Sequence, residues 1–208
     1  MAATLLFAMK EATQKENTMN KIKVLALFGK SGAGKDTIQN WIVSNIANTK
    51  GIVSCTTRPP RDYEIDGIHY HFLSNEQFAE KVLDGSMLEA ASFNGWFYGT
   101  AINELDADKV NVGVFNIKGI EQLLEDSRVD VFVLHISAFD KTRLIRNLNR
   151  EEYPNCAEIC RRYFTDEDDF RNIEFEYDEY LNEDMEDNNG DFSAVLEIES
   201  VAEFLNQK

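Results

Sequence analysis

The sequence predicts an α/β fold in which helices cover both faces of a mostly parallel β-sheet. Three short apolar runs, at residues 23–28, 110–117 and 129–136, have the composition of strands that are buried on both faces. A segment with helical spacing of apolar residues follows each run, and such alternation is typical of a parallel sheet. The 208 residues, 43% of them apolar, suffice for a single domain with inserts.

The first apolar run leads directly into a glycine-rich loop. Residues 29–37 read Gly-Lys-Ser-Gly-Ala-Gly-Lys-Asp-Thr, and apolar residues then recur at helical spacing from Ile38 to Ile46. The order strand, glycine loop, helix is the context in which the pattern G-x-x-x-x-G-K-[ST] forms a phosphate-binding loop, or P-loop. Backbone N–H groups of such a loop cradle phosphates, and we expect Lys35 to neutralise their charge.

Asp36 departs from the P-loop pattern. A hydroxyl normally follows the lysine and binds Mg²⁺, whereas Asp36 places a negative charge beside a polyanion. A carboxylate about 5 Å from a phosphate charge costs roughly 3 kcal/mol at an effective dielectric of about 20, but a divalent cation about 4 Å away returns roughly 8 kcal/mol. We therefore predict that Asp36 is a Mg²⁺ ligand, because this ion is commonly held by one or two carboxylates with phosphates and water.

Two segments interrupt the alternation of strands and helices. Residues 53–100 are polar and include a helix that Ser74 opens, with Gln77 in the capping-box position. Residues 141–170 place Arg146 and Arg150 on one face of a helix. We predict that both segments are inserts. The core is then expected at residues 21–52, 101–140 and 171–208, after a loose N-terminal extension at residues 1–20.

The end of the chain is acidic. Residues 165–191 contain thirteen Asp and Glu residues and a single basic residue, Arg171, and we interpret this run as a solvated, repulsive surface. A last apolar stretch, residues 194–198, is predicted to form a strand before a final helix.

The overall charge limits the partners of the protein. The chain has 37 acidic and 21 basic residues, a formal charge of −16, which argues against a broad face for nucleic acid. A small anionic ligand needs only a few cations. The three cysteines indicate reduced thiols in a cytoplasmic protein, and the N-terminus fits neither a secretory signal nor a membrane span. We make no prediction of oligomeric state.

The motif with the most fixed positions follows the glycine loop. Residues 54–72 read SCTTRPPRDYEIDGIHYHF, and residues 87–100 read MLEAASFNGWFYGT. Together with the loop they closely resemble guanylate kinases, whose monophosphate-binding segment reads approximately S-x-T-T-R-x-P-R-x-x-E-x-x-G-x-x-Y-x-F, then L-E and Y-G-[ST]. The resemblance implies a three-layer P-loop kinase fold with a small NMP-binding insert, residues 53–100, and a helical lid, residues 141–170. It also implies transfer of the γ-phosphoryl group of ATP to GMP or dGMP, with Mg²⁺.

The resemblance assigns roles to individual residues. Arginine forks and phenols suit a dianionic phosphate, and a carboxylate suits the N–H donors of guanine. The residues expected to bind GMP are Ser54, Arg58, Arg61, Tyr70, Glu89, Tyr98, Thr100 and Asn116. Those expected to bind ATP are Gly29, Lys30, Ser31, Gly32, Ala33, Gly34, Lys35, Asp36 and Thr37. Those expected to act in catalysis are Lys35 and three lid arginines, Arg146, Arg150 and Arg162.

One departure from the family bears on the metal. Guanylate kinases usually carry D-x-D where this chain reads Val114-Phe115-Asn116. Asn116 can hydrogen-bond a base or a water but supplies no charge to Mg²⁺. We expect Asp36 to replace the lost acid from the other side of the metal.

Three alternatives remain at this point. The G-K-D-T ending of the loop also resembles phage deoxynucleotide kinases, so another deoxynucleoside monophosphate is a second substrate class. A guanylate-kinase-like module that has lost catalysis and binds a protein partner is opposed by the retention of Gly29, Gly34 and Lys35. A P-loop ATPase that binds nucleic acid is opposed by the net charge.

Overall fold

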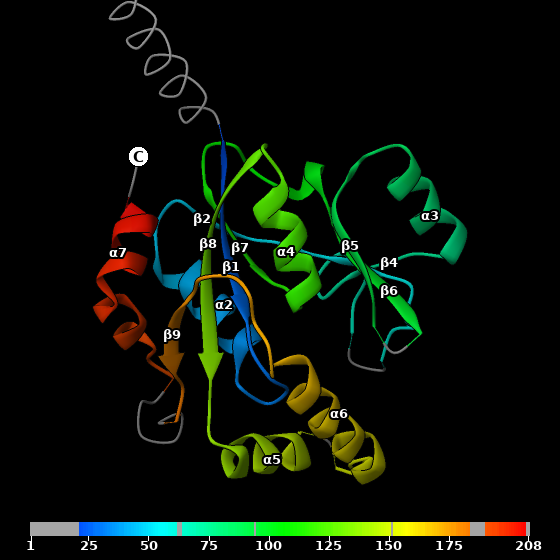
Figure 1. The fold of residues 1–208 in the computed structure, drawn as a ribbon, viewed down its shortest axis with the longest axis vertical. Helices are drawn as coiled ribbons and strands as arrows, with labels where there is room; N and C mark the ends of the chain where they lie inside the picture. Colours follow the sequence, from blue (N-terminus) through cyan, green and yellow to red (C-terminus); the bar gives the residue numbers. More distant parts are fainter. Residues whose placement is uncertain (1–20, 62–63, 94, 151, 184–189, 207–208) are drawn as a thin grey trace, which may run out of the picture.

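The structure is a computed structural model that describes residues 21–61, 64–93, 95–150, 152–183 and 190–206. The predicted extension at residues 1–20 lies outside the described residues. Two sheets lie side by side, and helices surround the larger one (Figure 1). Within the described ranges, no helix is long and apolar enough to cross a membrane.

A five-stranded parallel sheet forms the centre of the molecule. Its strands are β1 (Ile22–Phe28), β2 (Thr49–Gly51), β7 (Val110–Val114), β8 (Val129–Ser137) and β9 (Asp178–Leu181). They follow the order β2-β7-β1-β8-β9, and every neighbouring pair is parallel. The three predicted apolar runs supply β1, β7 and β8, so the predicted parallel sheet is confirmed. Because the strands are parallel, their carboxyl ends meet at one edge, where the P-loop follows β1.

Helices cover both faces of this sheet and create three layers. They are α2 (Lys35–Asn45), α4 (Ile117–Glu125) and α7 (Glu199–Asn206). Successive side chains of β1 point to opposite faces. Leu25 and Leu27 belong to the core shared with α2 and α7, whereas Val24 and Ala26 belong to the core shared with α4. All four side chains are fully buried.

The segment predicted as the first insert forms a second sheet. Its strands are β3 (Cys55–Thr56), β4 (His71–Phe72), β5 (Met87–Phe93) and β6 (Trp96–Ala101), in the order β4-β3-β6-β5. Helix α3 (Asn75–Leu83) begins at Ser74, and the predicted capping box with Gln77 is confirmed. The Gln122 side chain on α4 exchanges two hydrogen bonds of 3.0 Å with the backbone of Ala90 in β5. This sheet is therefore fastened to the core through β5.

Two helices lie beside the P-loop at the carboxyl edge of the large sheet (Figure 1). They are α5 (Asp140–Asn149) and α6 (Cys156–Asp169), and they make up most of the segment predicted as the lid. A short 3₁₀ helix, Ile102–Glu104, connects the second sheet to the strand β7 region. The segment predicted as the lid therefore lies beside the loop that follows β1 (Figure 1).

Two expectations for the end of the chain are wrong. The acidic run at residues 165–191 is more than a solvated surface, because it contains β9, which pairs with β8, and the buried Asn182. An edge strand has a solvated side, so acids are compatible with it while Tyr180 packs against the core. Residues 194–198 form no strand but lie in and just after a 3₁₀ helix, Ser193–Glu197, which places Val195 in the core. A short apolar run alone does not distinguish these two conformations.

Gly29 determines how the chain leaves β1. Its φ is +155°, and a Cβ at this position would lie 2.1 Å from the carbonyl oxygen of Ile136 in β8. Both the backbone angle and the close approach of the two segments therefore require glycine.

We predict that Gly29→Ala lowers the free energy of unfolding by about 2–4 kcal/mol, because backbone strain and a steric clash add. Gly67→Ala is the matched control: its φ is +75°, and nothing lies within 4 Å of the added Cβ. This variant should lower the free energy of unfolding by only about 1 kcal/mol, the energy of placing an alanine in the left-handed conformation. Urea unfolding of both variants measures the difference, and equal losses would contradict the clash with β8.

Candidate active site

The P-loop lies between β1 and α2 and holds its lysine against its own backbone. The Lys35 ammonium donates to the carbonyl oxygens of Gly29, at 2.7 Å, and Lys30, at 3.2 Å. Burial lowers the pKa of Lys35, while the charges of Asp36 and Asp166 oppose the shift. The loop thus keeps a desolvated cation where phosphate is expected, and the cation's field is strong because little water screens it.

Side chains from two other elements support the far half of the loop. Arg146 on α5 donates to the carbonyl oxygen of Gly32, at 3.4 Å, and to that of Asn182, at 2.9 Å. The buried amide of Asn182, just after β9, donates to the carbonyl oxygen of Ala33 at 2.7 Å. Asn182 is a loop-supporting residue that the sequence analysis missed, because the surrounding acids concealed β9.

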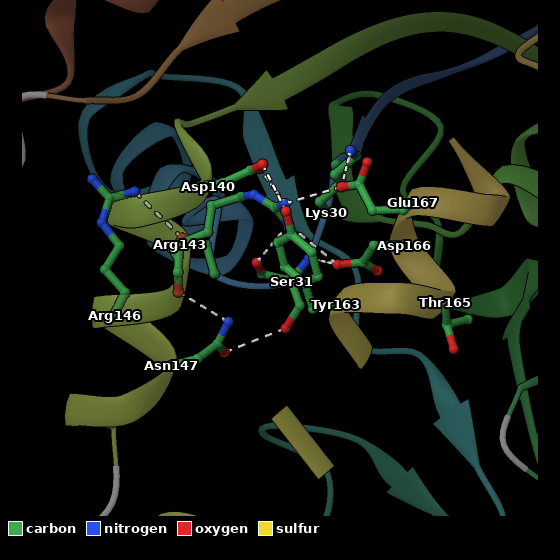
Figure 2. Close-up of polar contacts among 12 residues, drawn as sticks. Lys30, Ser31, Asp140, Arg143, Arg146, Asn147, Tyr163, Thr165, Asp166 and Glu167 are labelled. Atoms are coloured by element: carbon green, nitrogen blue, oxygen red, sulfur yellow. Dashed lines mark hydrogen bonds and ion pairs between the residues drawn. The ribbon is translucent and has the colours of Figure 1, made fainter. Parts of the chain in front are cut away.

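Helix α6 also reaches the P-loop, through carboxylates (Figure 2). The Ser31 backbone N–H donates to Asp166 at 2.6 Å, and the Lys30 ammonium pairs with Glu167 at 2.5 Å. Arg143 on α5 is only 2% exposed and pairs with Asp166, at 3.4 Å, and Glu167, at 3.5 Å. Arg143, Asp166 and Glu167 were not assigned to the site from the sequence.

The predicted lid arginines have different surroundings. Arg146 contacts the loop directly, as described above. Arg150 is exposed at the end of α5, and its charge adds a small contribution to the lowered pKa of Lys35, which burial dominates. Arg162 instead pairs with Glu158 on its own helix, at 2.8 Å. Hydrogen bonds from Arg161 and then Arg162 lower the pKa of Glu158 to about 2. The structure therefore places Arg146 at the loop, Arg150 near it, and Arg162 in an ion pair on α6.

A buried carboxyl group marks the base end of the expected acceptor site. Glu89 in β5 is 6% exposed, and Thr100 in β6, which is fully buried, hydrogen-bonds to it. Burial raises the pKa of Glu89 to about 7, although the bonds from Thr100 oppose the shift. The Thr100 hydroxyl also lies 3.2 Å from that of Ser54. These three predicted residues are therefore adjacent.

Asn116 lies beside Glu89 at the start of α4. Its side-chain oxygen accepts from the Gly119 N–H at 2.7 Å, which caps the helix. A Cβ on Gly119 would lie 3.0 Å from a carboxylate oxygen of Glu89, so the two segments approach closely. The amide nitrogen of Asn116 makes no hydrogen bond within the described part of the chain, and it can donate to a bound base.

Two arginines and two tyrosines gather at the phosphate end of the expected acceptor site. The Arg58 guanidinium lies 5.6 Å from the ring centre of Tyr70 and hydrogen-bonds with Tyr98. Arg58 also pairs with Glu64 at 2.7 Å, and the backbone N–H of Arg61 donates to the same carboxylate at 2.8 Å. Glu64, which stands in the quoted motif but was given no role, also lies 3.7 Å from the Arg61 guanidinium and so pairs with both arginines.

Asp36 faces the acceptor side of the loop. Burial raises the pKa of Tyr70 to about 12, and the charge of Asp36 is the second cause. The Asp36 carboxylate is exposed and makes no hydrogen bond or ion pair with the described residues. The charge of Asp36 therefore acts on Tyr70, one of the residues expected to bind the acceptor phosphate.

The residues around Asp36 suit a metal that is shared with a nucleotide. Among the described residues, no group of three or more His, Cys, Asp or Glu side chains is arranged to hold a metal. Asp36 and the adjacent Thr37 are both exposed and offer a carboxylate and a hydroxyl. Mg²⁺ accepts such a partial set, because phosphate oxygens and water complete its octahedron.

Comparisons with known proteins identify relatives along nearly the whole chain. The profile of the family described as guanylate kinase matches residues 21–199. A guanylate kinase of Nostoc sp. is 31% identical over 199 residues, which cover 93% of this chain and 94% of that protein. A guanylate kinase of Helicobacter hepaticus is 35% identical over 122 residues, or 55% of this chain and 61% of that protein. The crystal structure of guanylate kinase from Anaplasma phagocytophilum shares the fold, with a TM-score of 0.60, 21% identity and coverage of 89% and 90%.

Proposed function

Because this chain belongs to the guanylate kinase family, we propose that it transfers the γ-phosphoryl group of ATP to GMP or dGMP, giving ADP and GDP or dGDP. The observation that carries the choice of guanine is the buried carboxyl group of Glu89, held between Thr100 and the start of α4. A carboxylate accepts two N–H groups from the guanine edge. Adenine offers a different pattern and leaves the carboxylate unpaired, which is costly in a buried site.

The phosphate of the acceptor is proposed to bind between the arginines and tyrosines of the insert. Arg58 and Arg61 supply forked, charge-assisted donors, and Tyr70 and Tyr98 supply phenol donors. Glu64 already pairs with both guanidinium groups, so less conformational entropy is lost when the phosphate arrives. These arginines and tyrosines would bind the phosphate of any nucleoside monophosphate, whereas Glu89 would select the base.

On the donor side, we propose that the loop positions ATP and that cations neutralise the transferred group. Phosphoryl transfer depends mainly on positioning and on stabilising the charge of the transition state. Lys35 and Arg146 are in contact with the loop, and the charge of Arg150 acts on Lys35. Asp36 and Thr37 would hold Mg²⁺ together with the phosphates, and the ion would add positive charge against the β- and γ-oxygens. Arg162 joins this set only if its pair with Glu158 opens.

We also propose nucleotides as the partners and the cytoplasm as the location. The described cysteines, Cys55, Cys156 and Cys160, are all free thiols, as expected in a reducing compartment. The charge of −16 disfavours a nucleic-acid partner.

A coupled assay of ADP release with ATP, Mg²⁺ and a panel of ribo- and deoxynucleoside monophosphates tests the function. Turnover with GMP or dGMP alone supports the proposal. Turnover with another base would favour the deoxynucleotide kinase class. Absence of turnover with every monophosphate, despite measurable GMP binding, would favour a module that binds a protein partner.

We predict that the KM for GMP rises about tenfold between pH 8 and pH 6, because the pKa of Glu89 in the free protein is about 7. Below this pKa the protonated carboxyl dominates and has lost acceptor capacity, and above it the carboxylate is free to bind guanine. Steady-state kinetics over this pH range measure the effect.

Glu89→Gln is the control for the pH prediction, since it keeps the shape of the side chain and removes its titration. It should lower kcat/KM for GMP by about tenfold or more, equal to ~1.4 kcal/mol, and flatten the pH dependence. If the variant kept both the guanine preference and the pH dependence of the parent, another group would read the base.

We predict that Asp36→Asn binds ATP more tightly in the absence of Mg²⁺, by about threefold to tenfold, because one repulsive charge is removed. With Mg²⁺ it should need more metal for the half-maximal rate and lose kcat. Calorimetry without metal and a Mg²⁺ titration of the rate measure the two effects. Asp130→Asn, at an exposed site on β8, is the matched control and should change neither.

Asp36→Ser distinguishes a metal ligand from a defect in the loop. The serine restores the usual hydroxyl but leaves no acid near the metal, so we expect only part of the rate. Adding Val114→Asp should recover more, and the excess over additivity measures the compensation. If Asp36→Ser alone matched the parent at every Mg²⁺ concentration, Asp36 would have no role at the metal.

A further inference from the structure

An anionic side chain accepts a hydrogen bond from a backbone N–H of the P-loop that is expected to bind phosphate. The Ser31 N–H is one of the backbone donors that the loop pattern directs toward phosphate, and here it donates to a carboxylate oxygen of Asp166 at 2.6 Å (Figure 2). Beside it, the Lys30 ammonium is held by Glu167 at 2.5 Å. Adjacent acids of α6 thus engage adjacent donors of the loop.

The cation that anchors these acids is buried. Arg143 pairs with Asp166 and Glu167, and with Asp140 at 2.7 Å, while its guanidinium lies 5.4 Å from the ring centre of Tyr163. It also donates to the carbonyl oxygen of Ser31 at 3.3 Å, but its Nε has no partner among the described residues. A buried charge needs such partners, so Arg143 draws the acids of α6 toward the loop.

The surroundings of Asp166 are those that a phosphate needs. Burial raises the pKa of this carboxyl, and the Ser31 N–H, Lys35, Arg143 and Lys30, in that order, oppose the shift. A backbone N–H and three cations around one desolvated oxyanion would equally receive a phosphate oxygen. A phosphate and this carboxylate cannot both accept from the Ser31 N–H, and at contact distance they repel each other.

We propose that Asp166 and Glu167 form an intramolecular latch that competes with the terminal phosphate of ATP for the P-loop. The proposal rests on the proposed function in one respect, that ATP binds at this loop. Binding of ATP displaces the two carboxylates and releases α6 from the loop. The apparent affinity for ATP is then reduced by the fraction of molecules that are unlatched.

The latch differs in its consequences from a purely structural ion pair. If Asp166 only neutralises Arg143, removing its charge destabilises the protein and leaves ATP binding equal or weaker. If Asp166 competes with phosphate, the same change strengthens ATP binding, because the competitor is gone. The sign of the change in affinity therefore separates the two roles.

The test measures binding of ATP with Mg²⁺ to the full chain by calorimetry. We expect Asp166→Asn to bind ATP about tenfold more tightly than the parent, equal to about 1.4 kcal/mol. Glu167→Gln should act in the same direction with a smaller effect. Asp169→Asn is the matched control, since Asp169 is exposed on the same helix and makes no hydrogen bond or ion pair with the loop in the described part of the chain, yet the charge change is identical. Its affinity should equal that of the parent.

A second experiment tests whether the two carboxylates hold α6 against the loop in the absence of nucleotide. Hydrogen exchange of residues 156–169 should be faster in nucleotide-free Asp166→Asn than in the nucleotide-free parent, and unchanged in Asp169→Asn. Thermal melting shows whether each variant is folded. If Asp166→Asn does not fold, Glu167→Gln is judged by the same two outcomes.

The latch is overturned if Asp166→Asn binds ATP no more tightly than the parent, or if Asp169→Asn tightens binding as much. A parent that binds ATP but does not phosphorylate GMP overturns the proposed function and leaves the latch test intact. A parent that binds no ATP overturns both.

Discussion

The P-loop can display its N–H groups to phosphate only if its carbonyl oxygens find partners elsewhere, since the loop pairs with no strand. Every carbonyl from residue 29 to residue 33 accepts a hydrogen bond from a side chain. Lys35 donates to the first two carbonyls, those of Gly29 and Lys30. The carbonyls of Ser31, Gly32 and Ala33 accept from Arg143, Arg146 and Asn182, respectively. They come from α2, from α5 and from the residue after β9. A buried carbonyl without a partner would cost about 1–3 kcal/mol, so these elements are arranged around the loop by a requirement of its backbone.

This requirement also explains the position of one buried charge, Arg143. Arg143 is among the largest fully buried side chains of the described residues, and it is the buried residue that binds both the loop and the acids of α6. The cations of the loop region are therefore matched by carboxylates rather than left to repel one another. Because the chain has more acidic than basic residues, carboxylates are available to pair with these cations.

The sequence predicted the parts of the fold that depend on local pattern. The strands β1, β7 and β8 are continuous apolar runs, and the capping box of Ser74 is a local hydrogen-bond motif. Strand β9 was missed because an edge strand beside solvent needs few apolar residues, and the sequence shows mainly its acids. Asn182 was missed with it. The burial of Arg143 was equally invisible, because it results from acids 23 and 24 residues away that meet it only in the folded state.

The two hydrogen bonds between Gln122 and Ala90 give the second sheet a fixed side and a free side. Glu89 is adjacent to Ala90, so the group that we propose to bind the base stands on the side joined to α4. Arg58 and Arg61 follow β3, which β6 separates from β5 in the sheet. If the sheet rotates about β5, Glu89 stays near the axis, whereas the arginines that follow β3 move further. Such a rotation would move Arg58 and Arg61 relative to the P-loop by more than it moves Glu89.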